Sequence, residues 1–241
     1  MSICICPVWA ADTSKENLTV GTSYEEPSKI YFVEDILNLD LSDEELNDIY
    51  KIYKDRIEGV PLMYQTDYPH IPFSHGTVAT SGCGISCAAM VISYLTDTDV
   101  TPGLLGETFN LPGKSNMERM EAALDHYDIS YTVSFSWNEA YEALSNNQVV
   151  ISLQNPGIFT DYGHFILLTG INEEGLITVN DPYQPNYYSP AKRANGLANG
   201  FSSEQVKENA SGYWIFEKKD LPDIKIVGDI SMLYTMFNSL G

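Results

Sequence analysis

An apolar helix that begins at a Gly-Cys-Gly sequence is the feature that most restricts the fold of this 241-residue chain. Residues 84–95, which follow Cys83, read GISCAAMVISYL and place apolar side chains on nearly every side of a helix. A helix without a polar face has to be surrounded by other elements, so we predict that it is central and buried. A chain of this length can bury one full core around such a helix.

The segments after this helix predict further helices and then a sheet. Start signals and helical spacing indicate helices at 101–109, 115–126 and 137–144. Alternating or continuous apolar runs indicate strands at 129–135, 149–153, 164–170, 176–179 and 213–217. Because helices come first and a mostly antiparallel sheet follows, we predict an α+β fold with a helical lobe packed on a sheet lobe.

The segment before this core is predicted to belong to the same domain. Ser42 and Glu45 form a capping box for an amphipathic helix at 42–59. The apolar face of this helix has to be buried, so we expect it to pack on the main domain. We therefore predict a single domain over residues 28–241, with its core at about 61–217.

Two later segments lie outside the regular pattern. Residues 183–211 are rich in Asn, Gly, Ser and Pro and predict a surface insertion with one helix near 204–209. Loops of such length are often functional. A short apolar helix is expected near 232–237. The sequence does not show whether the 183–211 stretch or the helix at 42–59 covers a cleft.

The N-terminal residues resemble the end of a secretion signal. Residues 1–11 read MSICICPVWAA, a short apolar run that ends in small residues, and residues 12–27 are polar. We interpret 1–27 as a leader remnant or flexible arm and predict a secreted or cell-surface protein. The alternative is an ordinary N-terminal strand.

Charge and cysteine content exclude several classes of function. The chain has 33 acidic and 13 basic residues, a net charge of -20, and such a surface repels nucleic acid and anionic lipid. No apolar run reaches the roughly 20 residues of a membrane span. Cys4 and Cys6 lie in the predicted leader, and Cys83 and Cys87 are interpreted as free thiols. No His, Cys or Asp cluster has metal-ligand spacing, so we predict no metal. We also predict no organic cofactor.

Cys83 is the candidate nucleophile. The first turn of a helix carries a partial positive charge, which lowers the pKa of a thiol and favours the reactive thiolate. Gly82 and Gly84 permit a tight backbone and the close approach of a substrate carbonyl. The alternative is an inert core cysteine, and this is our interpretation of Cys87, one turn further along the same helix.

Three other residues are candidates to assist this thiol. His164 begins an apolar strand and could act as a general base, although a structural histidine is the alternative. Asp181 ends the following strand and could orient His164; Asn180 is the alternative, and strand alternation lets only one of the two serve. Gln65 could donate to an oxyanion beside the backbone N–H of Cys83, unless it is an ordinary surface residue.

These motifs together resemble a known family. The sequences YQTD, HGTVATSGCGISCAAMVISYL, GHFILLTGI and ITVNDP are similar to bacterial cysteine peptidases related to bacteriocin-leader-processing enzymes, in particular their stand-alone secreted branch within the papain-like superfamily. The resemblance covers about 61–182 and implies a papain-like fold. It implies that Gln65, Cys83, His164 and Asp181 form the site. One departure is Ile85-Ser86, where the family commonly has Pro-Thr or Pro-Ala.

The expected activity is thiol-dependent hydrolysis of peptide or related amide bonds in a peptide or protein substrate. Two alternatives stay open at this point. The fold could hold a peptide without cutting it, because fold does not determine function. The same acyl-enzyme could instead pass its acyl group to an amine, as in transglutaminase-like cross-linking. The sequence determines neither the substrate nor the oligomeric state.

Overall fold

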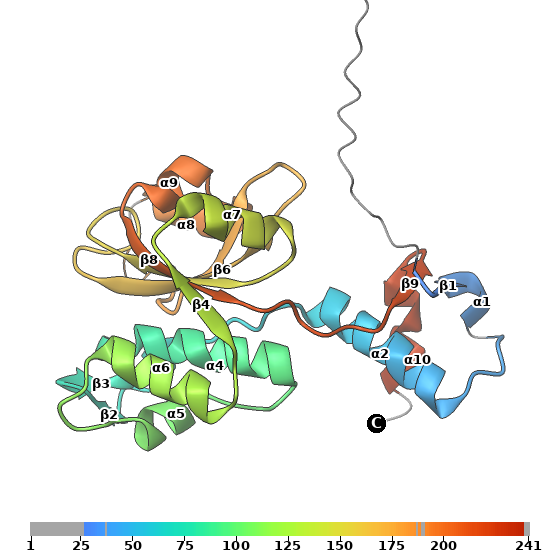
Figure 1. The fold of residues 1–241 in the computed structure, drawn as a ribbon, viewed down its shortest axis with the longest axis horizontal. Coiled ribbons are helices and arrows are strands. Elements are labelled where there is room, and N and C mark those ends of the chain that lie inside the picture. Colours follow the sequence, from blue (N-terminus) through green and yellow to red (C-terminus); the bar gives the residue numbers. More distant parts are fainter. Residues whose placement is uncertain (1–26, 37, 187, 189–190, 239–241) are drawn as a thin grey trace, which may run out of the picture.

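The computed structural model describes residues 27–36, 38–186, 188 and 191–238 (Figure 1). Most of the predicted leader remnant, including Cys4 and Cys6, lies outside the described residues. No helix within the described ranges combines the length and the apolar character needed to cross a membrane.

A five-stranded antiparallel sheet forms the middle of the molecule. Its strands follow the order β4 (Tyr131–Ser134), β8 (Ala210–Phe216), β5 (Val150–Gln154), β6 (His164–Ile171) and β7 (Ile177–Asn180). The strands predicted from alternation and apolar runs are all present. The turn at 172–175 joins β6 to β7, with Gly175 at a φ of 76°, a region that glycine adopts at no steric cost.

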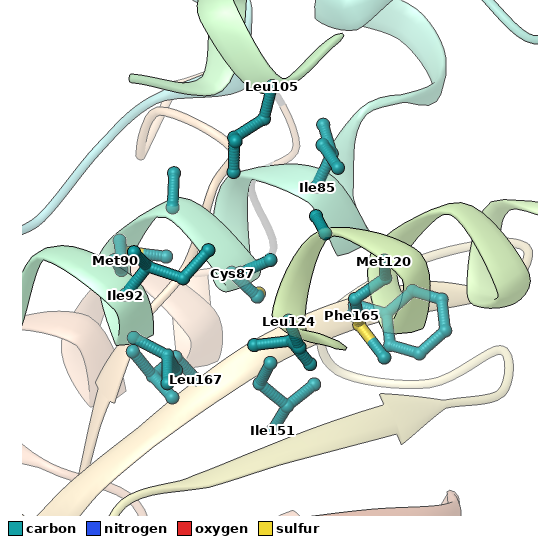
Figure 2. Close-up of a cluster of buried hydrophobic side chains, with 14 of the residues drawn as sticks. Ile85, Cys87, Met90, Ile92, Leu105, Met120, Leu124, Ile151, Phe165 and Leu167 are labelled. Carbon is teal, nitrogen blue, oxygen red and sulfur yellow. The ribbon is translucent and has the colours of Figure 1, made fainter. Parts of the chain in front are cut away.

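The predicted apolar helix lies on one face of this sheet. It is α4 (Cys83–Thr96), and α5 (Pro102–Thr108) and α6 (Asn116–His126) lie in the same layer (Figure 1). Ten consecutive residues of α4, from Cys83 to Ile92, are buried. Figure 2 shows Cys87 and Met90 of α4 packed among Leu124 of α6 and Ile151 of β5. This confirms the α+β fold with a helical lobe on an antiparallel sheet.

Three further helices cover the opposite face of the sheet. They are α7 (Trp137–Ser145), α8 (Ala191–Asn199) and α9 (Ser203–Lys207) (Figure 1). The sheet therefore has helices on both faces. The 183–211 stretch contains two helices and a buried arginine, Arg193, where the sequence predicts a surface insertion with one helix.

The chain enters the helical layer through short elements at 65–81. These are η1 (Gln65–Asp67), the hairpin of β2 (Pro72–Phe73) and β3 (Gly76–Thr77), and α3 (Val78–Ser81). Gly82 separates α3 from α4. Its N–H donates to the Val78 carbonyl at 2.8 Å, and its own carbonyl accepts from the Ser86 N–H at 2.9 Å. The backbone thus turns from one helix directly into the next at this residue.

The two ends of the described chain form a smaller unit with its own apolar cluster. It contains β1 (Lys29–Phe32), α1 (Val33–Ile36), α2 (Asp43–Glu58), β9 (Ile224–Val227), η2 (Ile230–Leu233) and α10 (Tyr234–Asn238). The expected capping box of Ser42 and Glu45 is present at the start of α2. However, α2 packs on β9 and η2 of the small unit, not on the sheet (Figure 1). That 28–241 folds as one domain stays a prediction.

Candidate active site

Cys83 is the first residue of α4, and its position depends on two glycines. The side chain is only 9% exposed. A Cβ on Gly82 would lie 2.5 Å from the Val78 carbonyl oxygen, closer than real Cβ contacts allow. A Cβ on Gly84 would lie 3.2 Å from the Phe165 ring of β6. Both glycines therefore let the start of α4 approach its neighbours closely. The predicted approach of a substrate carbonyl stays a prediction.

We expect Gly82→Ala to lower the free energy of unfolding by about 1–3 kcal/mol, because the added methyl group meets the backbone of Val78 as well as its side chain. Urea denaturation followed by circular dichroism measures the change. Gly163→Ala is the matched control next to His164, since a Cβ there has nothing within 4 Å. Equal stability of the two variants would contradict the steric role given to Gly82.

His164 begins β6, and Asp181 directly follows β7, its neighbour in the sheet. Both side chains are almost fully buried, and the His164 Nε2 lies 2.8 Å from Asp181 Oδ1. Burial alone would lower the histidine pKa, but the charge of Asp181 and its hydrogen bond raise the pKa of His164 to about 9. Burial tends to raise the pKa of Asp181, but His164 and Arg193 hold it below its ordinary value. The pair is therefore an imidazolium–carboxylate pair near neutral pH.

The other side of the imidazole interacts with the thiol of Cys83. Burial tends to raise the thiol pKa, but a side-chain hydrogen bond and the charge of His164 outweigh it and lower the pKa of Cys83. The His164 Nδ1 has no hydrogen bond of regular geometry, so its contact with the sulfur is a loose one. Such loose geometry is common before substrate binds. The arrangement favours a thiolate–imidazolium pair, which is the reactive state of a cysteine nucleophile.

Cys87 lies one turn further along α4 and faces the apolar core (Figure 2). It is fully buried and has no disulfide partner among the described residues. Burial, together with the negative charges of Cys83 and Asp181, raises the pKa of Cys87 well above the ordinary value. Its thiol therefore stays protonated and unreactive, in agreement with its interpretation as a core residue.

The structure distinguishes Asn180 from Asp181, which the sequence leaves as alternatives. Asp181 accepts the hydrogen bond of His164. Asn180 points elsewhere, and its Nδ2 donates to the carbonyls of Val60 and Pro61 at 3.0 Å each. Asn180 thus ties the end of β7 to the segment that precedes η1.

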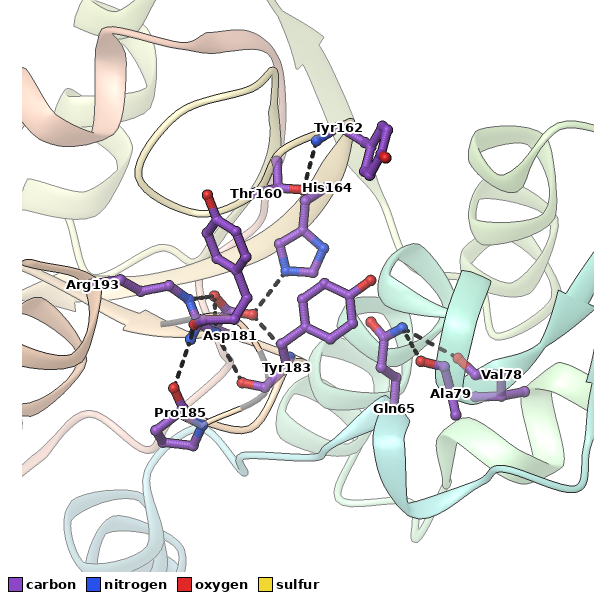
Figure 3. Close-up of polar contacts among 11 residues, drawn as sticks. Gln65, Val78, Ala79, Thr160, Tyr162, His164, Asp181, Tyr183, Pro185 and Arg193 are labelled. Atoms are coloured by element: carbon purple, nitrogen blue, oxygen red, sulfur yellow. Dashed lines mark hydrogen bonds and ion pairs between the residues drawn. The ribbon is translucent and has the colours of Figure 1, made fainter. Parts of the chain in front are cut away.

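Gln65 is close to the site, but the N–H groups of its side-chain amide bond to α3 instead. The side chain is 0% exposed. Its Nε2 donates to the carbonyls of Ala79 at 2.8 Å and Val78 at 3.3 Å, while Oε1 has no hydrogen-bond partner (Figure 3). Both donor positions of the amide are therefore occupied by α3. An oxyanion would need the amide to turn over, so the role of Gln65 as a donor stays a prediction.

Two residues of the site have no counterpart in the sequence-based prediction. The ring of Tyr183 stacks on the imidazole of His164, with centroids 4.4 Å apart and planes 11° apart. Arg193 is 0% exposed and forms an ion pair with Asp181, with Nη2 2.8 Å from Oδ2 (Figure 3). A signal for Arg193 exists in the sequence, because Lys192 and Arg193 are the only charged residues between Asp181 and Glu204.

The site contains no set of metal ligands. Across the described part of the chain, no three or more His, Cys, Asp or Glu side chains gather as a metal ion would require. The chemistry that these residues can perform is that of a nucleophilic thiol with a proton-carrying imidazole.

A thiol at the start of a buried helix, with an imidazole that a sheet carboxylate orients, is the arrangement of papain-like cysteine peptidases. A family model described as "Peptidase_C39 like family" matches residues 57–205. Because the match spans more than half of the chain, the chain belongs to this family, which confirms the resemblance seen in the sequence. A comparison with curated proteins finds no match.

Two solved structures are similar to this chain. One is described as a C39-like peptidase from Bacillus anthracis; it is 14% identical, with 68% of this chain and 98% of that chain covered and a TM-score of 0.42. The other is the peptidase domain of Streptococcus ComA, a bi-functional ABC transporter involved in a quorum sensing pathway; the identity is 13%, the coverage 67% and 99%, and the TM-score 0.44. The family assignment rests on the family match, not on these two structures.

Proposed function

We propose that this chain is an active cysteine peptidase that hydrolyses peptide or related amide bonds. The observation that carries the proposal is the buried group of Cys83, His164 and Asp181, in which the imidazole hydrogen-bonds the carboxylate and its charge lowers the pKa of the thiol. Burying three ionisable groups together is costly unless they compensate one another. A nucleophile that must be charged to react makes use of such an arrangement.

Each residue has a distinct role in the proposed reaction. The Cys83 thiolate attacks the substrate carbonyl carbon and forms a C–S bond, and the backbone N–H of Cys83 donates to the oxyanion. The His164 imidazolium then protonates the leaving amine as the C–N bond breaks. Water, deprotonated by His164, hydrolyses the thioester and releases a carboxylic acid and the free thiol. Asp181 keeps the imidazole in the required tautomer and orientation throughout.

A direct test is incubation of the full chain with a mixture of unstructured peptides, followed by mass spectrometry. Hydrolysis yields fragment pairs that add one water, and these fragments should be absent with Cys83→Ala. Adding a primary amine distinguishes acyl transfer, because the products would then carry the amine at a new C-terminus. Peptide binding without fragments in either reaction would favour the binding module.

The pH dependence of Cys83 alkylation gives a second test. Because the thiol pKa is lowered, the thiolate persists below the ordinary titration range, so alkylation by iodoacetamide should begin at a lower pH than that of a free cysteine. Hydrolysis also needs the imidazolium, whose pKa is about 9, so hydrolysis should fall as the pH rises through 9 while alkylation does not. Peptide mapping by mass spectrometry assigns the label to Cys83. A rise of alkylation only near pH 8.5, as for a free cysteine, would contradict the proposed ion pair.

Secretion is a separate proposal that rests on residues 1–11. We propose that the protein acts outside the cytoplasm, where peptide substrates are accessible to a free enzyme. Fractionation of the producing cells, with detection of the protein by an antibody, tests this. Recovery only from the cytoplasm would contradict it.

A further inference from the structure

Arg193 is the most fully hydrogen-bonded charged side chain near the site. Its guanidinium carries five N–H groups, and five contacts meet them: Nε and Nη2 to Asp181 Oδ2, Nη1 to the carbonyls of Pro185 and Tyr188, and Nη2 to the carbonyl of Tyr183. The residue is fully buried on α8. A buried cation without such partners would be strongly destabilising, so these five contacts allow Arg193 to be buried here.

The contacts of Arg193 fall into two sets with different consequences. Those to Asp181 occupy Oδ2 and leave Oδ1 to accept from His164 Nε2 and from the Tyr183 N–H, at 2.8 and 2.9 Å. Those to the carbonyls hold the chain that leaves the sheet after β7. In Figure 3 the Arg193 side chain reaches Asp181, while Tyr183 lies between Asp181 and Gln65.

The second set also positions an aromatic ring. Tyr183 stacks on His164 in nearly parallel planes, and Arg193 binds the carbonyl of this same residue. A ring on one face of the imidazole keeps water from the His164–Asp181 hydrogen bond, which is stronger in such an environment. Arg193 therefore positions both the Asp181 carboxylate, which accepts the hydrogen bond of the proposed base His164, and the Tyr183 ring, which covers its imidazole.

We propose that Arg193 is a positioning residue of the active site: it holds the Asp181 carboxylate against His164 and anchors Tyr183 over the imidazole ring. The inference rests on the proposed function of Cys83 and His164. It assigns the 183–211 stretch a part in catalysis, although this stretch lies outside the nucleophile and base motifs. A planar fork suits the role better than an ammonium group, because one guanidinium reaches the carboxylate and three carbonyls at once.

The charged and titratable groups around Asp181 determine the sign of the expected effect. They are His164 on β6, Arg193 on α8, the thiol of Cys87 on α4, and Tyr183, whose backbone N–H donates to the carboxylate. Arg193 supplies the positive charge on the side of Asp181 opposite the imidazole. Its removal leaves the carboxylate poorly held beside the imidazole. This loss of position, and not the loss of positive charge, weakens the support of the imidazolium and so makes the thiolate of Cys83 less stable.

The test compares Arg193→Met and Arg193→Lys with the wild type and with Arg119→Met. Arg119 is a buried arginine of α6 that bonds to Ser74, Asn116 and Leu111 and not to the site. We expect Arg193→Met to move the pH midpoint of Cys83 alkylation upward by about one unit. We also expect it to lower kcat up to about 100-fold, with KM changed little. Arg193→Lys should lie between, and Arg119→Met should lower only the thermal stability.

Each outcome decides between the two proposals. An alkylation midpoint of the wild type that is already that of a free cysteine overturns the proposed function itself. A low midpoint in the wild type that Arg193→Met and Arg193→Lys leave unchanged overturns only the positioning role. If Arg193→Met does not fold, the pH profile of Cys83 alkylation in Arg193→Lys decides instead. A shift of equal size in Arg119→Met would show a general effect of lost stability and would also overturn the inference.

Discussion

Replacing Cys83 with alanine is expected to abolish peptide hydrolysis and iodoacetamide labelling at this position. The thiolate is the only group in the proposed reaction that forms a bond with substrate carbon, so no partial mechanism remains without it. Removal of a nucleophile that works as a unit with its base costs on the order of 10⁶ in rate. The measurement is fragment formation from peptides, with mass-spectrometric mapping of the label.

Cys87→Ala is the matched control, because the two thiols share one helix and differ in surroundings. Cys87 is buried in the apolar cluster, and its raised pKa keeps it protonated. We expect this variant to retain both hydrolysis and labelling of Cys83, with some loss of stability from the smaller side chain. If Cys87→Ala alone lost both properties, the nucleophile would be wrongly assigned.

Much of the fold could be predicted because its signals are local. The apolar run of α4, the capping boxes of α2 and α6, and the alternation of the strands all lie within about 16 residues of chain. The order of the elements then implies a sheet with a helix layer. The pairing of β1 with β9, by contrast, joins residues 29–32 to 224–227 in parallel, and nothing in either short segment indicates the other.

The site could be predicted in part, for a related reason. Cys83, His164 and Asp181 follow recognisable motifs at element ends, and the sheet brings the last two together across β6 and β7. Arg193 belongs to no such motif. Its only signal is that it and Lys192 are the sole charged residues between Asp181 and Glu204, and arginine is almost never fully buried unless it is paired. That Arg193 pairs with Asp181 becomes evident only once α8 is placed against the sheet. The orientation of Gln65 depends likewise on carbonyls of α3 that no sequence pattern reveals.

Replacing His164 with alanine is expected to have the second largest effect, a loss of kcat of about 10²–10⁴-fold. Without the imidazolium, the leaving amine departs unprotonated and water attacks the thioester unaided. The thiol also loses the interactions that lower its pKa, while burial, which raises it, remains. Alkylation of Cys83 below the pH range of a free cysteine should therefore be lost together with hydrolysis, although the sulfur itself is unchanged.

His126→Ala provides the control for this last experiment. His126 ends α6, is exposed, and has Phe109 and Tyr127 as its ring neighbours, so its removal leaves the thiol and Asp181 untouched. Hydrolysis rates and alkylation profiles of the two variants should be compared over pH 5–10. Retention of both low-pH alkylation and hydrolysis by His164→Ala would mean that another group activates Cys83. Cys83 and His164 would then not form a thiolate–imidazolium pair, and the roles given to Asp181, Tyr183 and Arg193, which all depend on that pair, would fall with it.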